Sequence, residues 1–255
     1  MHSHISFGYP SFITYAHLPI LAVAGLLTAL SWTRKWPRWL TAIFGVLALW
    51  SFTAFLVMRF GVNINGRGSL PTQAFLPQGT GRVLDLGAGT GRSTLMVLES
   101  RPGTKVVSLD LFGESFSQHF GGTKTQDEGK AMLLANLRAA GVADRASIEA
   151  ADMRSLPFPD NSFDAIISAY AVDHLNRDGI RRTLLESHRV LKPQGQFLIM
   201  VIANDPWMRY AFGPLLDHMT NNPQRFWPDQ IRAAGFEVQE QGLRPATLYI
   251  LARRP

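Results

Sequence analysis

Residues 83–91 read Val-Leu-Asp-Leu-Gly-Ala-Gly-Thr-Gly, and this stretch decides the fold. Apolar residues surround one acid, Asp85, and three glycines then alternate with small residues. The pattern predicts a buried parallel strand that ends in a tight turn, because glycine lets the backbone turn sharply and approach a ligand closely. A helix is expected to begin at Arg92, with its first N–H groups available to a polar or anionic ligand. Such a unit places a cofactor at the carboxyl edge of an open α/β sheet.

The spacing of the glycines separates two kinds of cofactor site. A dinucleotide site requires G-x-G-x-x-G, whereas Gly87, Gly89 and Gly91 alternate here and Arg92 occupies the position due for the third glycine. The form D-x-G-x-G-x-G resembles the first motif of class I S-adenosylmethionine-dependent methyltransferases, in which the turn wraps the methionine end of the cofactor. A nicotinamide or flavin site is the alternative.

The resemblance implies a Rossmann-like, seven-stranded, mostly parallel sheet with an antiparallel last strand. Strand and helix patterns that alternate along the chain independently favour a parallel sheet with crossover helices. The cofactor implied is S-adenosyl-L-methionine. The motif assigns its contacts at the turn to Asp85, Gly87, Ala88, Gly89, Thr90 and Gly91.

Length and charge limit the function further. The chain has 255 residues, enough for one α/β domain and an appendage. It has no Cys, which excludes disulfides and thiolate metal sites, and no metal site is expected. The net charge of +6 arises in residues 1–84, which carry six Lys or Arg and no acid, while the remainder is balanced. A neutral catalytic part disfavours a nucleic-acid partner.

Residues 1–60 are predicted to form a membrane anchor. No charged side chain occurs from Ile5 to Thr33, and a second uncharged run covers Leu40 to Met58. Each run has about 20 residues, which matches the hydrocarbon core of a bilayer, so helices are expected at about 13–32 and 40–59. The link between them carries basic residues and interfacial aromatic anchors, namely Arg34, Lys35, Arg38, Trp32, Trp36 and Trp39.

Three other kinds of segment are alternatives for residues 1–60. A signal peptide has a charged start and one apolar run, and a transit peptide is Arg-rich and amphipathic. Two helices of a soluble core would normally show a polar face. The Gly-, Asn- and Pro-rich residues 61–80 are predicted to be a linker, and residues 81–255 the cofactor-binding methyltransferase domain.

A second acid follows the next predicted strand. Asp110 ends the apolar run that begins at Lys105 and lies 19 residues beyond Gly91, the distance at which a carboxylate meets ribose hydroxyls. A helix cap or turn residue is the alternative role. Leu111 follows and is expected to pack on the adenine.

The third and fourth strands complete the expected cofactor site. In the methyltransferase family, an acid after the third strand accepts from the adenine amino group and its neighbour packs on the ring, which assigns these roles to Asp152 and Met153. Ser168, at the end of the fourth predicted strand, is a further candidate cofactor contact. The run 152–166 resembles the small-molecule branch of the family, which includes quinone and sterol methyltransferases.

A base is required only if the methyl acceptor must lose a proton. The loop after the fourth strand carries Asp173 and His174, the candidate catalytic residues, because it leaves the sheet beside the cofactor. His119 and His218 are rival bases. His188 is interpreted as a histidine at the edge of the core, four residues after Leu184 on an amphipathic helix.

Two segments could cover the site. Residues 113–125 are irregular and Gly-rich, which suits either a flap or a plain surface loop. Residues 204–226 are rich in aromatic residues, which suits either an insertion over the substrate or an ordinary connecting helix.

These features together predict a membrane-anchored methyltransferase acting on a lipophilic small molecule, such as a quinone, phenol, lipid amine or thiol. A methyltransferase-like membrane assembly factor without activity is the alternative. The basic residues flanking the two helices nearly balance, so charge leaves the orientation open. Because the cofactor pool is cytoplasmic, we expect the catalytic domain and both termini to face the cytoplasm.

Overall fold

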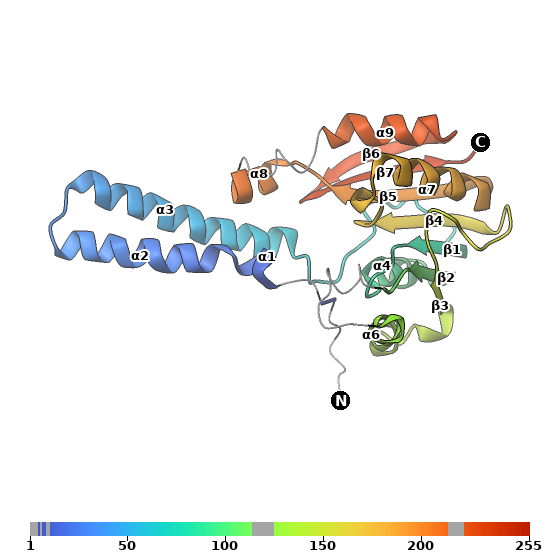
Figure 1. The fold of residues 1–255 in the computed structure, drawn as a ribbon, viewed down its shortest axis with the longest axis horizontal. Coiled ribbons are helices and arrows are strands. Elements are labelled where there is room, and N and C mark those ends of the chain that lie inside the picture. Colours follow the sequence, from blue (N-terminus) through green and yellow to red (C-terminus); the bar gives the residue numbers. More distant parts are fainter. Residues whose placement is uncertain (1–4, 6, 9–10, 114–124, 214–221) are drawn as a thin grey trace.

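The computed structural model describes residues 5, 7–8, 11–113, 125–213 and 222–255. Figure 1 shows an α/β domain from which a pair of antiparallel helices projects to one side. The α/β domain follows the expected alternation of strands and helices. The projecting pair is formed by the N-terminal part of the chain.

A seven-stranded sheet forms the centre of the domain, with strand order β3-β2-β1-β4-β5-β7-β6. Its strands are β1 (Thr80–Leu86), β2 (Gly103–Asp110), β3 (Ala146–Ala150), β4 (Phe163–Ala169), β5 (Leu191–Ile202), β6 (Glu237–Arg244) and β7 (Thr247–Arg253). Strands β1 to β5 are parallel to one another, and β7 runs antiparallel between β5 and β6. This is the predicted topology, with an antiparallel last strand.

Helices cover both faces of the sheet (Figure 1). One face carries α4 (Arg92–Ser100) and α6 (Gln126–Ala139), and the other carries α7 (Arg177–Val190) and α9 (Pro223–Ala233). Successive strand residues alternate between two cores, because side chains of a strand point to opposite faces. In β4, for example, Ile166 belongs to the core under α7 and α9, and Ile167 to the core under α4 and α6.

The N-terminal helices form a hairpin. Its elements are α1 (Ser11–Tyr15), α2 (His17–Thr33), α3 (Arg38–Leu56) and the π-helical turn η1 (Val57–Val62). The first predicted helix is divided at Ala16, because Pro19 in the first turn of α2 has no N–H to donate to the preceding turn. Of the described helices, the continuous run Arg38–Val62 is long and apolar enough to cross a membrane, whereas the 17-residue α2 is shorter.

The base of the hairpin packs on α8 (Pro206–Phe212), a short helix that follows β5. A small apolar cluster joins the two parts, formed by Ala54, Met58, Met208, Ala211 and Ala246. The predicted linker covers residues 61–80, of which residues 61–62 belong to η1 and residue 80 begins β1; residues 63–79 contain no helix or strand and lie against the domain. Their buried side chains Leu70, Phe75 and Leu76 join the core under α4 and α6. The hairpin is therefore fastened to the domain at two places.

Candidate active site

The glycine turn lies at the carboxyl end of β1, as predicted. Gly87, Gly89 and Gly91 all have positive φ (73°, 53° and 95°), a conformation that other residues rarely adopt. A Cβ at Gly87 would collide with Ala171, and a Cβ at Gly91 would collide with Leu133. Two of the three glycines are thus required by close packing as well as by the backbone angle.

Asp85 lies in β1, two residues before the first glycine of the turn. Its carboxylate is fully buried and accepts hydrogen bonds from the hydroxyls of Ser93 (2.7 Å) and Thr94 (2.6 Å). Burial raises the pKa of this carboxyl to about 6, although the two hydroxyls oppose the shift. Because both hydroxyls belong to the first turn of α4, Asp85 ties β1 to the helix that follows the turn. The predicted role of Asp85 in cofactor binding would be exerted through the shape of the turn.

Asp110 meets the turn from the neighbouring strand. Its Oδ2 accepts from the backbone N–H of Gly89 at 2.9 Å, and its Oδ1 accepts from that of Phe112 at 3.2 Å. The carboxylate is half-buried, and the Leu111 side chain beside it is exposed. A carboxylate oxygen can accept more than one hydrogen bond, so Asp110 keeps acceptor capacity for ribose hydroxyls.

Asp152 and Met153 follow β3 at the same edge of the sheet. Arg154 donates from Nε (2.9 Å) and Nη2 (2.6 Å) to the Asp152 carboxylate. These bonds lower the pKa of Asp152, which therefore stays ionised and remains an acceptor. The Met153 methyl group lies 3.2 Å from the position of a Cβ at Gly87, so this side chain lies against the glycine turn.

Ser168 is buried near the end of β4, where its hydroxyl donates to the Leu86 carbonyl at 3.0 Å. It therefore holds β4 against β1 immediately before the turn. Tyr170 follows at a positive φ of 56°, and its hydroxyl shares a hydrogen bond with that of Thr247. The Arg92 guanidinium lies 5.9 Å from the Tyr170 ring centre.

Asp173 and His174 lie in a short 3₁₀ turn, η3 (Val172–His174), that directly follows these residues. The His174 side chain is exposed and that of Asp173 is half-buried. The turn begins beside Ala171, which contacts Gly87, so the loop does leave the sheet next to the cofactor turn. The rival bases His119 and His218, most of the predicted flap 113–125 and part of the segment 204–226 lie outside the described residues. His188 is partly buried against Phe236, as expected for a histidine at the edge of the core.

Sequence reasoning missed one set of contacts at the turn. The Thr90 hydroxyl donates to the Phe7 carbonyl at 2.8 Å, and the Asn136 amide donates to the Thr90 carbonyl at 2.9 Å. Phe7 itself is buried in the core under α4 and α6. These contacts join residues 46 and 83 positions apart, and no local pattern indicates such pairs. Phe7, in the N-terminal arm that precedes α1, thus contacts the glycine turn directly.

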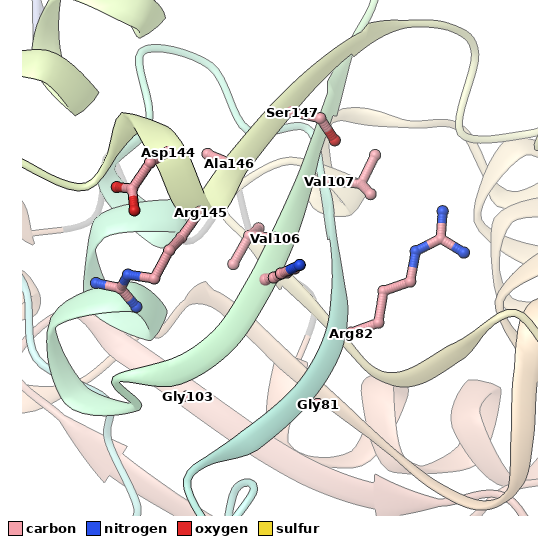
Figure 2. A pocket seen from close by; sticks show the side chains of 10 residues that line it. Gly81, Arg82, Gly103, Val106, Val107, Asp144, Arg145, Ala146 and Ser147 are labelled. Carbon is pink, nitrogen blue, oxygen red and sulfur yellow. The ribbon is translucent and has the colours of Figure 1, made fainter.

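A cavity of about 420 Å³ opens at the opposite edge of the sheet from the glycine turn (Figure 2). Its lining includes Gly81 and Gly103 at the starts of β1 and β2, together with the basic side chains of Arg82, Lys105 and Arg145. It lies at the amino ends of these strands, opposite the glycine turn. Because ligands of open α/β sheets bind outside the carboxyl ends, this cavity is separate from the candidate active site.

Comparisons with known proteins agree with this geometry. Residues 84–199 match the model of a methyltransferase domain. The chain is 30% identical over 207 residues to a demethylmenaquinone methyltransferase of Clavibacter sepedonicus, covering 71% of this chain and 76% of that protein. It is 28% identical to the ubiquinone/menaquinone biosynthesis C-methyltransferase UbiE of Paracoccus denitrificans, covering 63% and 68%.

The fold has a solved counterpart in an O-methyltransferase family 2 protein from Planctomyces limnophilus. The TM-score is 0.54 at 17% identity, over 92% of this chain and 62% of that chain. The described residues contain no group of three His, Asp or Glu side chains that could hold a metal ion. On its motif, its sheet topology and its relatives, the chain belongs to the class I methyltransferases and is an enzyme that uses S-adenosylmethionine as its methyl donor.

Proposed function

We propose that the enzyme methylates a lipophilic, quinone-like acceptor taken from a membrane in which its hairpin is anchored. The quinone-like acceptor is supported by the relatives, which are named as methyltransferases of menaquinone and ubiquinone synthesis. The observation that carries the proposal is the apolar hairpin fastened to α8, because α8 follows β5 at the edge of the sheet where the cofactor turn lies.

The residues at this edge fit S-adenosylmethionine. The glycine turn would receive its methionine end, the Asp110 carboxylate its ribose, and Asp152 with Met153 and Leu111 its adenine. The bound cofactor supplies a methyl group already activated on a sulfonium, so the protein contributes mainly by positioning the acceptor. The Gly89 N–H of the turn donates to Asp110, which holds this carboxylate beside the turn.

His174 is the group proposed to hold or remove the proton of the acceptor, with Asp173 beside it. Imidazole is the side chain that most often serves as a general base. Its exposure in η3 leaves it accessible to an acceptor that arrives at the carboxyl edge of the sheet.

Membrane anchoring is supported by the surface of the hairpin. A groove of about 360 Å³ between α2 and α3 is lined only by apolar side chains: Pro19, Ile20, Val23, Ala24, Leu27, Phe44 and Leu47. Within Arg38–Val62, only 11% of the most apolar stretch is buried inside the protein. A large contiguous apolar surface rarely faces water in a monomeric protein, and the apolar surface of the hairpin suits the hydrocarbon of a bilayer.

The catalytic domain is proposed to face the cytoplasm, where its cofactor is made. The link between the helices would then lie at the opposite face of the membrane. The exposed residues Thr33 and Ser147 allow a test because the native chain has no Cys. In intact cells, an impermeant thiol reagent should label Thr33→Cys and spare Ser147→Cys; the reverse pattern would show that the domain faces outward.

The proposed acceptor can be tested with the purified full-length enzyme. Labelled S-adenosylmethionine would be offered with a membrane lipid extract and with a panel of phenols, amines, thiols and demethylated quinols. We expect label in a quinone-like product that partitions into the lipid phase. Label only in a water-soluble amine or thiol would reject the quinone-like acceptor and leave the methyltransferase activity intact.

A further inference from the structure

Most exposed aromatic side chains of the hairpin and of α8 fall in two groups. The tip group consists of Trp32, Trp36 and Trp39, and the base group consists of Phe12, Tyr15, Phe60 and Trp207. Two exposed rings lie between the groups, Phe52 on α3 and Tyr210, which contacts Thr53 of α3. Most of the large exposed side chains between the groups are aliphatic, among them Val23, Leu26, Ile43, Val46 and Leu49. Aromatic rings flanking an aliphatic zone are typical of segments that meet both interfaces of a bilayer.

The separation of the two groups matches a bilayer. Phe60 follows Trp39 by 21 residues along α3 and η1, and Tyr15 precedes Trp32 by 17 residues along α1 and α2. At a rise of about 1.5 Å per residue, these intervals correspond to roughly 26–32 Å. The hydrocarbon core of a bilayer is about 30 Å thick. With the basic tip at the far interface, the base group therefore lies at the near one.

The short helix α8 runs beside the last third of α3. The Trp207 ring lies close to Gly61, near the end of η1. At the other end of α8, the Tyr210 hydroxyl shares a hydrogen bond with Thr53, which is nearer the tip of the hairpin. Gly61 and Thr53 are eight residues apart, about 12 Å along the helix axis. Trp207 is thus at the level of Phe60, and Tyr210 is at a deeper level.

Protein side chains form hydrogen bonds with backbone groups at both ends of α8. At its C-terminal end, Trp50 Nε1 donates to the Tyr210 carbonyl at 2.9 Å, and His17 Nε2 donates to the Ala211 carbonyl at 2.8 Å. These carbonyls belong to the last turn of the helix, which has no internal donors. At the other end, the buried carboxylate of Asp205 accepts from the Met208 N–H at 2.8 Å, and Pro206 has no N–H to satisfy. Backbone groups within lipid must be satisfied in this way, because no water reaches them.

We propose that α8 is a second membrane contact, which dips into the near leaflet beside α3 with Trp207 at headgroup level and Tyr210 below it. This contact holds the carboxyl edge of the sheet against the lipid, so that the acceptor reaches the methyl group from the near leaflet across α8. The inference rests on the membrane anchoring in the proposed function. It adds that the catalytic domain itself enters the bilayer through α8, between β5 and the hairpin.

Spin labels on single cysteines can measure these depths, because the native chain has no Cys. The full-length protein would be reconstituted into phosphatidylcholine–phosphatidylglycerol vesicles with a nitroxide at Val46→Cys, Tyr210→Cys, Trp207→Cys or Ser147→Cys. All four side chains are exposed. Depth would be measured by relaxation with oxygen, which concentrates in lipid, against a water-soluble nickel complex. The expected order from deep to shallow is 46, 210, 207 and 147, with 147 fully aqueous.

The outcomes separate this inference from the proposed function. A label at 207 and 210 as aqueous as that at 147, with 46 deep, would overturn the inference and leave the anchor standing. An aqueous label at 46 as well would reject the anchor itself. Labels at 207 and 210 shielded from both reagents would assign α8 to a protein contact instead, and would also overturn the inference.

A functional experiment tests the consequence of the contact. Trp207→Ala should raise the apparent KM severalfold for an acceptor embedded in vesicles, and should leave the KM for the same acceptor in detergent micelles unchanged. Leu185→Ala, which removes an exposed apolar side chain from α7 on the far side of the domain, is the matched control. An equal loss with both acceptors would indicate a merely structural role for Trp207 and would contradict access across α8.

Discussion

The backbone N–H of Gly89 donates a hydrogen bond to Oδ2 of Asp110 at 2.9 Å, and so links the glycine turn to the end of the neighbouring strand. The two residues are 21 positions apart: Gly89 lies in the turn that follows β1, and Asp110 ends the adjacent parallel strand β2. This contact holds the Asp110 carboxylate at the turn through the protein's own backbone. A preorganised carboxylate loses little entropy when it accepts the hydroxyls of a ribose.

Replacing Asp110 should therefore weaken cofactor binding. Asp110→Ala removes acceptors for hydrogen bonds to a charged group, which contribute about 1.5–3 kcal/mol, or roughly 10- to 150-fold in affinity. Calorimetry with S-adenosylmethionine and S-adenosylhomocysteine would measure the loss, with the exposed Asp178→Ala on α7 as control. Equal affinities for the Asp110 variant and the native enzyme would remove Asp110 from the cofactor site.

His174 should matter for turnover and little for cofactor binding. If it is the general base, His174→Ala should lower kcat by about 10²–10⁴-fold, the usual contribution of such a group. Because the side chain is exposed, the variant should fold normally. Steady-state kinetics with the true acceptor provide the measurement, and calorimetry provides the control. Unchanged turnover would show that the acceptor needs no base at this position.

Asp85 should make stability depend on pH in an unusual direction. Its folded-state pKa of about 6 lies above the ordinary value of 3.8, so the folded protein binds the proton more tightly than the unfolded chain. Stability from this group is therefore fully present below about pH 4 and is lost as the pH rises through 6, by on the order of 3 kcal/mol. Thermal unfolding of the native enzyme and of Asp85→Asn between pH 4 and 7 would measure it. The difference between the two proteins should shift in favour of the variant as the pH rises, and a constant difference would exclude the raised pKa.

Thr90 should couple the N-terminal arm to the cofactor turn. Thr90→Val leaves the buried Phe7 carbonyl without its donor, which should cost about 1–3 kcal/mol of stability and also weaken cofactor binding. Thr104→Val is a matched control. Thr104 lies at the start of β2, away from the turn, and its buried hydroxyl donates to the Arg101 carbonyl. That control should lose stability only. If both variants bind the cofactor like the native enzyme, the arm plays no part in the site.

The fold was predictable because its signals are local. The apolar strand, the glycine turn and Asp110 all occur within one short stretch, and the seven-stranded, mostly parallel sheet with its antiparallel β7 agrees with the prediction. The positions of Asp152, Met153 and η3 at the same edge follow from the parallel strands that precede them. For the hairpin, only the second of the two predicted spans has the length of a membrane helix, since Pro19 and Ala16 shorten the first.

The remaining contacts could not be predicted because they join distant residues through side chains. Trp50 and Tyr210 are 160 positions apart, and neither stands in a motif. The network around Asp85 is different, because Ser93 and Thr94 lie in the next helix and a buried acid requires donors. That requirement could have indicated a positioning role for Asp85 from the sequence.

The most direct test of the account measures methyl transfer to an acceptor embedded in a membrane. The full-length enzyme would be reconstituted with labelled S-adenosylmethionine outside the vesicles and with a demethylated quinol bearing an isoprenoid tail in the bilayer, beside a tail-less analogue in solution. Mass spectrometry of the products should show one added methyl on the membrane-embedded quinol, formed faster than on the soluble analogue, and loss of that product with Asp110→Ala. Methylation of the soluble analogue alone, or no transfer to either by an enzyme that binds the cofactor, would contradict the account.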